Sequence, residues 1–89
     1  MHPEFTRVIQ FTLLVRAGGR LREFNFRKLN NPESEQFSAN VCDDKGERLF
    51  FYLQKNEGGW KLSLAALPPW IVQTERQISE ALQEELVKW

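Results

Sequence analysis

VCDDKGERLFFYL, residues 41–53, contains a turn signal between two runs of strand character, and the rest of the fold follows from how those runs pair. A three-residue loop, Asp44-Lys45-Gly46, suits a type I turn followed by a glycine in the left-handed conformation. That loop brings apolar residues together on one face of a hairpin, pairing Val41 with Leu49, Ala39 with Phe51 and Phe37 with Leu53. The other face pairs Cys42 with Arg48, Asn40 with Phe50 and Ser38 with Tyr52. Because a slip of one residue would exchange the two faces, the agreement favours this register.

The hairpin upstream, around Gly18-Gly19, gives the same result. Two glycines tolerate the positive φ angles of a two-residue turn. Such a turn pairs Leu13 with Phe24 and Phe11 with Phe26 on one face. The opposite face is mostly polar, and it pairs Gln10 with Arg27, Thr12 with Asn25 and Leu14 with Glu23. The two hairpins therefore predict a sheet that is apolar on one side only.

Further turn signals, from Asn30 to Glu35 and from Asn56 to Gly59, complete the division of the chain into predicted strands. The strands span residues 5–17, 20–28, 36–43, 47–54 and 60–65, each boundary being approximate. If Asn56-Glu57 forms the last loop, Leu53 faces Trp60 and Phe51 faces Leu62. Short connections favour a meander, in which each strand pairs with the next one along the chain.

The pattern changes at Pro68-Pro69. Proline cannot donate a hydrogen bond to a sheet, and it suits the first position of a helix. From this point the apolar residues recur with a helical period, which predicts a helix over residues 69–87. Its apolar stripe contains Ile71, Thr74, Ile78, Ala81, Leu82, Leu86 and Trp89. A helix of about 18 residues is about 27 Å long, enough to cross four strands.

The predicted fold is α+β: a five-stranded antiparallel β-meander followed by one C-terminal amphipathic helix packed on one face of the sheet, in a single domain over residues 1–89. The expected core consists of Ile9, Phe11, Leu13, Phe24, Phe26, Phe37, Val41, Leu49, Phe51, Leu53, Trp60 and Leu62, covered by Ile78, Leu82 and Leu86. One helix covers one face, so the other face of the sheet is expected to stay open.

Composition narrows the function classes. Hydrophobic residues make up 42% and charged residues 27% of the 89 positions, as in ordinary globular domains. The single cysteine, Cys42, cannot form an internal disulfide, and the only histidine, His2, lies in the N-terminal tail. With no catalytic or metal-binding constellation in the sequence, we predict that the protein is not an enzyme and uses no cofactor or metal. The sequence has neither a secretory signal nor a run that could span a membrane, which predicts cytoplasmic residence without membrane contact.

Charge is balanced overall, with 12 basic and 12 acidic residues, but it is unevenly distributed. Residues 1–28 hold six basic and two acidic groups, a net charge of +4, and residues 29–89 hold six basic and ten acidic groups, a net charge of −4. The plainer interpretation is a solvated strand pair beside an acidic helix. The other interpretation is a basic surface for an anionic partner.

The predicted open face carries two aromatic residues on one strand, Phe50 and Tyr52. The polar residues expected around them are Arg48, Lys61, Asn40, Ser38, Asn25 and Arg27. Exposed apolar patches usually mark association, so the first interpretation is a binding module that contacts a protein partner or a second copy of itself through this face. The alternative is a module for single-stranded nucleic acid, in which bases stack on the rings and cations meet the phosphates. By fold alone, a meander followed by a helix is similar in general plan to the Whirly and PUR-type single-strand binders.

Overall fold

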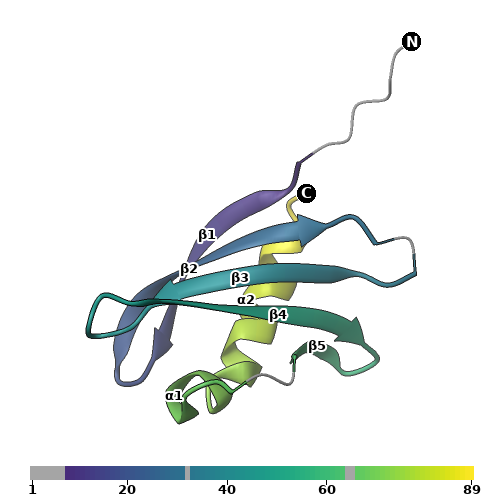
Figure 1. Ribbon diagram of the computed structural model, residues 1–89. Coiled ribbons are helices and arrows are strands. Elements are labelled where there is room, and N and C mark those ends of the chain that lie inside the picture. Colours follow the sequence, from purple (N-terminus) through teal and green to yellow (C-terminus); the bar gives the residue numbers. More distant parts are fainter. Residues whose placement is uncertain (1–7, 32, 64–65) are drawn as a thin grey trace.

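The chain folds as one curled antiparallel sheet followed by two helical segments (Figure 1). The computed structural model describes residues 8–31, 33–63 and 66–89. The strands, in chain order, are β1 Gln10–Ala17, β2 Arg20–Leu29, β3 Gln36–Cys42, β4 Arg48–Asn56 and β5 Gly59–Leu62. They lie side by side in the order β1-β2-β3-β4-β5, each antiparallel to its neighbours. The helical segments are α1 Pro69–Val72 and α2 Glu75–Leu86, so the α+β meander predicted from the sequence is confirmed.

Two hairpins have the registers that their turns predict. Gly18 and Gly19 form the first turn with φ angles of 64° and 83°, and Phe11 faces Phe26 across β1 and β2 as expected. Every predicted pair of β3 and β4 is also found. β1 begins at Gln10 rather than at residue 5, and the predicted strand residues 5–7 lie outside the described part of the chain.

The pairing of β4 with β5 differs from the prediction. Leu53 lies opposite Leu62 rather than Trp60, because β4 runs on to Asn56 and the two-residue turn is formed by residues 57 and 58. The Asn56 side chain accepts a hydrogen bond from the Gly58 N–H at 3.0 Å, which favours this turn over the one expected. Since the shift is two residues, Trp60 stays on the core side as predicted. The expected strand residues 64–65 lie outside the described residues.

The C-terminal helix is interrupted where a continuous helix over 69–87 was predicted. The interruption lies at Gln73 and Thr74, where the Thr74 hydroxyl donates to the Trp70 carbonyl at 2.6 Å. In an unbroken helix that carbonyl would accept the Thr74 backbone N–H, which instead bonds to the Ile71 carbonyl. The apolar stripe survives the interruption, since Ile71, Thr74 and Ile78 are all buried against the sheet side.

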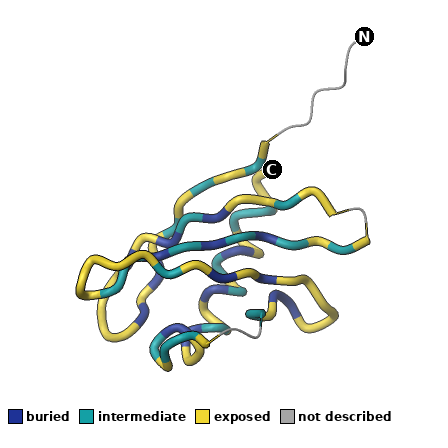
Figure 2. Tube along the Cα trace, in the orientation of Figure 1, coloured by how far each residue is buried: buried dark blue, intermediate teal, exposed yellow. Residues whose placement is uncertain are grey.

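The core lies between the sheet and α2, which crosses behind the strands (Figure 1). Along the strands buried residues alternate with exposed ones (Figure 2). Most of the predicted core is fully buried, namely Phe24, Phe26, Phe37, Val41, Phe51, Leu53, Trp60, Ile78 and Leu82. The others pack against it in a partly buried state, namely Ile9, Phe11, Leu13, Leu49, Leu62 and Leu86. Val15 and Ala17 extend the core beyond what the sequence indicated.

One charged side chain, Arg22, also lies on the core side and is only 8% exposed. Its Nε donates to the Ala17 carbonyl at 2.8 Å, and its Nη1 lies 3.1 Å from the Asp44 carboxylate. The guanidinium stands 4.2 Å from the centre of the Trp70 ring. Arg22 therefore connects the first hairpin to the turn between β3 and β4 and to α1.

A large cavity should make Leu53→Ala strongly destabilising. Leu53 is fully buried at the centre of β4, and truncating such a residue typically costs about 2–5 kcal/mol. Urea unfolding of the wild type and the variant measures the loss. A change below about 1 kcal/mol would place Leu53 outside the core.

Acid should remove the contribution that the ion pair of Asp44 makes to the free energy of unfolding. The hydrogen bond from Arg22, together with the charges of Arg22 and Arg20, lowers the pKa of Asp44 below its ordinary value of 3.8. The ion pair therefore stabilises the fold fully above that ordinary value, and its contribution is lost as the pH falls through the lowered pKa. Asp44→Asn should unfold at lower urea concentration than the wild type at neutral pH. The two midpoints should converge in acid, and an undiminished gap at about pH 2 would contradict this account.

Candidate functional site on the open sheet face

The face of the sheet away from α2 exposes two aromatic rings of β4. Phe50 is 68% exposed and Tyr52 is 53% exposed, whereas Phe51 and Leu53 between and beside them are buried. Side chains on a strand point to opposite faces in turn, so the covered pair dictates the position of the exposed pair. We refer to the side of the sheet that carries Phe50 and Tyr52 as the open face.

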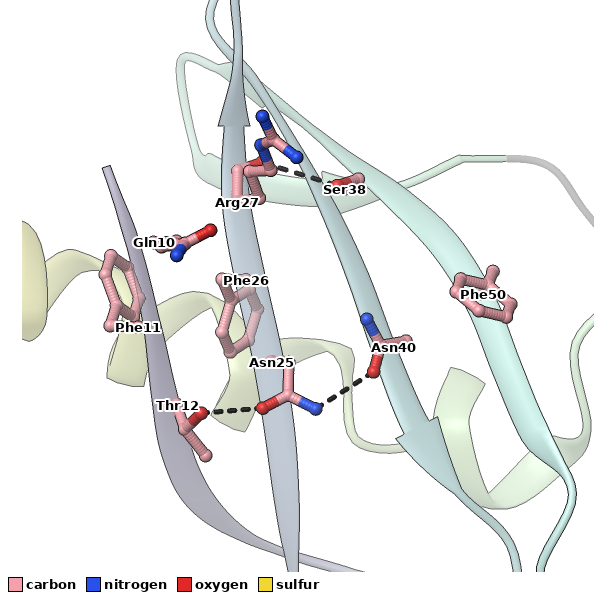
Figure 3. A pocket seen from close by; sticks show the side chains of 9 residues that line it. All are labelled: Gln10, Phe11, Thr12, Asn25, Phe26, Arg27, Ser38, Asn40 and Phe50. Atoms are coloured by element: carbon pink, nitrogen blue, oxygen red, sulfur yellow. Dashed lines mark hydrogen bonds between the residues drawn. The ribbon is translucent and has the colours of Figure 1, made fainter. Parts of the chain in front are cut away.

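A ladder of polar side chains crosses the open face from β1 to β4, and Figure 3 shows its part from Thr12 to Asn40. The Thr12 hydroxyl donates to Asn25 Oδ1 at 2.6 Å, and Asn25 Nδ2 donates to Asn40 Oδ1 at 2.9 Å. Arg48 Nη1 donates to the same Asn40 oxygen at 2.7 Å. Phe50 lies directly opposite Asn40 on the neighbouring strand, so the ladder leads to an aromatic ring.

The open face is hollowed above this ladder. A depression of about 580 Å³ is lined by Gln10, Phe11, Thr12, Asn25, Phe26, Arg27, Ser38, Asn40 and Phe50. A second depression of about 310 Å³ extends toward the turn between β3 and β4, and Asn25 borders both. The larger volume lies within the range of about 300–1,000 Å³ that is usual for small-ligand sites. The sheet thus offers a shallow polar hollow beside Phe50, which we call the Asn hollow.

The open face is positively charged although the chain as a whole is neutral. By strand alternation β1 to β4 place Arg16, Arg27 and Arg48 on it against one acidic strand residue, Glu23. Asp43 and Asp44 border its smaller depression, where Asp44 is paired with Arg20 and Arg22. Among the described residues Arg16, Glu23, Arg27 and Arg48 form no ion pair. The cations are therefore available to an anionic partner.

The structure gathers most of the residues that the sequence singled out. Phe50 and Asn40 face each other, Ser38 faces Tyr52, and both pairs adjoin the ladder. Asn25, Arg27 and Ser38 line the Asn hollow, and Arg48 closes the ladder. The ammonium of Lys61 is the exception, because it lies 3.8 Å from the carboxylate of Glu75 at the start of α2.

The candidate site residues named from the sequence did not include Thr12, Gln10 and Arg16. The predicted register had already placed Thr12 and Gln10 on this face, opposite Asn25 and Arg27, and the structure has the same pairs. The hollow itself had no sequence signal, since it depends on how the sheet curls.

Comparison of the chain with protein-family models, with curated proteins and with solved structures finds no match. Within the described ranges no group of three or more His, Cys, Asp and Glu side chains could hold a metal ion. His2 lies outside those ranges. None of the helices described is long and apolar enough to cross a membrane.

Replacing the exposed rings should leave the fold intact. Thr at positions 50 and 52 suits a strand, and both native side chains are more than half exposed. The double variant Phe50→Thr, Tyr52→Thr should change the free energy of unfolding by less than about 1 kcal/mol. Phe51→Ala, one residue away on the buried side, should cost about 3–5 kcal/mol. Comparable losses in the two variants would show that the exposed rings belong to the core.

Proposed function

We propose that the protein is a non-catalytic module that binds single-stranded nucleic acid across its open face. The observation that carries the proposal is the exposed pair Phe50 and Tyr52 standing beside a polar hollow on a positively charged face. Bases stack on aromatic rings without needing a particular sequence, and nearby cations meet the phosphates. Amide side chains such as Asn25 and Asn40 can hydrogen-bond to base edges.

Charge distinguishes this partner from a second copy bound face to face. Two open faces in contact would bring together two surfaces of net positive charge, each carrying Arg16, Arg27 and Arg48. Like charges brought together across an interface disfavour association. A phosphate backbone has the opposite charge, and it would neutralise the three arginines.

Shape supports the same choice. The centre of the open face is hollow and is lined mainly by amide, hydroxyl and guanidinium groups. The core of a protein interface is usually depleted of charge and well packed. A flat base could lie on Phe50 with its polar edge over the Asn hollow. Such a base matches this surface better than the flat apolar patch of a protein partner would.

Association with a protein, the first interpretation of the sequence, remains the second candidate. Leu14 and Leu21 are exposed on the same face, near the first turn, and add apolar area to the aromatic pair. Exposed apolar groups of this kind are common at association sites. The predicted cytoplasmic residence does not depend on the partner, and it is compatible with both candidate functions.

Fluorescence anisotropy with a labelled single-stranded DNA of about 12 nucleotides tests the proposal. We expect the wild type to bind, and Phe50→Thr, Tyr52→Thr to bind at least about thirtyfold more weakly, since stacking contributes about 1–3 kcal/mol per base. With three arginines engaged, log Kd should rise with log salt concentration with a slope of about 2.

The double variant Val72→Ala, Val87→Ala serves as the control. Both valines are exposed, Val72 at the end of α1 and Val87 just after α2, so the variant removes exposed apolar groups that lie outside the sheet. It should bind the DNA as the wild type does. Absence of binding by the wild type would overturn the proposal. If sedimentation then showed a dimer that the double Thr variant dissociates, protein association would take its place.

A further inference from the structure

The hydrogen-bond ladder on the open face has a fixed polarity, and Arg48 is the residue that sets it. A guanidinium only donates hydrogen bonds, so Asn40 must turn its oxygen toward Arg48. The same oxygen accepts from Asn25 Nδ2, which in turn directs the Asn25 oxygen toward the Thr12 hydroxyl. With either amide reversed, two donors or two acceptors would face each other along this path.

This polarity directs both amide oxygens to partners within the ladder and leaves the Asn40 nitrogen over as a donor. The Asn40 oxygen accepts two hydrogen bonds, from Arg48 and Asn25, and the Asn25 oxygen accepts one, from Thr12. Within the described part of the chain, Asn40 Nδ2 makes no hydrogen bond, and Asn25 Nδ2 makes one of its possible two. The guanidinium of Arg27, at the rim of the Asn hollow, is also without a partner among these residues. Figure 3 shows the Asn40 nitrogen on the Ser38 side of the ladder, where the hollow lies.

On the basis of the binding function proposed above, we propose that the Asn hollow selects keto bases, thymine or uracil and guanine, over amino bases. On the side next to Phe50 the hollow presents the unbonded N–H groups of Asn40, which complement carbonyl oxygens and disfavour exocyclic amino groups. The acceptors in its lining, Gln10 and Thr12, lie on β1, three strands away from Phe50. Thymine offers the O2 and O4 acceptors and guanine offers O6 and N7, whereas cytosine and adenine carry an amino group at the corresponding edge. A base stacked on Phe50 lies next to Asn40, so its edge meets these donors.

Arg48 is a positioning residue in this scheme. Its guanidinium acts on the base through Asn40, by keeping the amide nitrogen of that residue turned toward the hollow. Arg48→Gln removes the constraint, because a Gln side chain can either donate or accept and so permits both orientations of the ladder. Arg48→Lys retains a group that only donates.

Oligothymidylate and oligocytidylate form the matched pair of probes, since both are pyrimidine strands and their hydrogen-bonding edges differ at the keto and amino groups. We expect the wild type to bind oligothymidylate about tenfold more tightly, equivalent to about 1.4 kcal/mol. Arg48→Gln should bring the ratio of the two dissociation constants close to one, and Arg48→Lys should restore much of it.

Arg16→Gln is the charge-matched control, because Arg16 lies on the open face but takes no part in the ladder or the Asn hollow. It should weaken both probes by the same factor and leave their ratio unchanged. If Arg16→Gln lowered the ratio as far as Arg48→Gln, the polarity of the ladder would not be its cause.

The outcomes separate the two proposals. Equal binding of the two probes by the wild type, with both losing affinity in Phe50→Thr, Tyr52→Thr, would overturn the base preference and retain single-strand binding. Tighter binding of oligocytidylate would also overturn the preference. Failure of the wild type to bind either probe would overturn both proposals.

Discussion

Strand β4 carries five large apolar residues in succession, Leu49 to Leu53, and the chain supplies a single layer of helix to cover them. Because strand side chains alternate, that layer buries Phe51 and Leu53 and leaves Phe50 and Tyr52 outside. Two exposed aromatic rings forgo part of the stabilisation that burial would provide, at about 25 cal/mol per Å² of apolar surface. The exposed aromatic pair, and with it the proposed function, follows from this mismatch in β4, which is apolar on both faces although the helices cover only one.

Turn chemistry made most of the sheet predictable. At Gly18-Gly19 the turn type fixes the pairing of β1 with β2, and apolar agreement checks it. Near residues 56–59 there are two alternative two-residue turns, the predicted one at 56–57 and the observed one at 57–58. Both keep Trp60 on the core side, so the pattern of apolar residues could not distinguish them. The Asn56 side chain decided the matter through a local hydrogen bond, which a pattern of faces does not include.

The residues whose surroundings the sequence does not reveal are polar ones whose partners come from distant elements. Arg22 occupies an inward position in β2, and it is accommodated there by Asp44 and Trp70, which lie far along the chain. Lys61 occupies an open-face position in β5, and its ammonium lies 3.8 Å from the carboxylate of Glu75 in α2. Strand alternation assigns a direction to the Cβ atom, whereas a long side chain reaches whichever partner the tertiary fold provides.

The same tertiary context gives the open face its chemistry. Asn25 and Asn40 are ordinary strand residues in the sequence, but adjacent strands bring them together and Arg48 orients both. The ladder uses their oxygens within the sheet and leaves nitrogens for a partner. Polar side chains that bond across strands in this way also hold the floor of the hollow in one arrangement, which would lower the entropy cost of the binding proposed here.

Side-chain amide resonances test the central claim most directly. In a ¹H–¹⁵N spectrum titrated with single-stranded oligothymidylate, the account predicts shifts of the NH₂ groups of Asn25 and Asn40, which lie on the open face. The indole N–H resonances of Trp60 and Trp70, on the helix side of the sheet, should stay in place. Shifts confined to the indoles, or amide resonances that do not move at saturating oligonucleotide, would contradict the assignment of the open face as the binding surface.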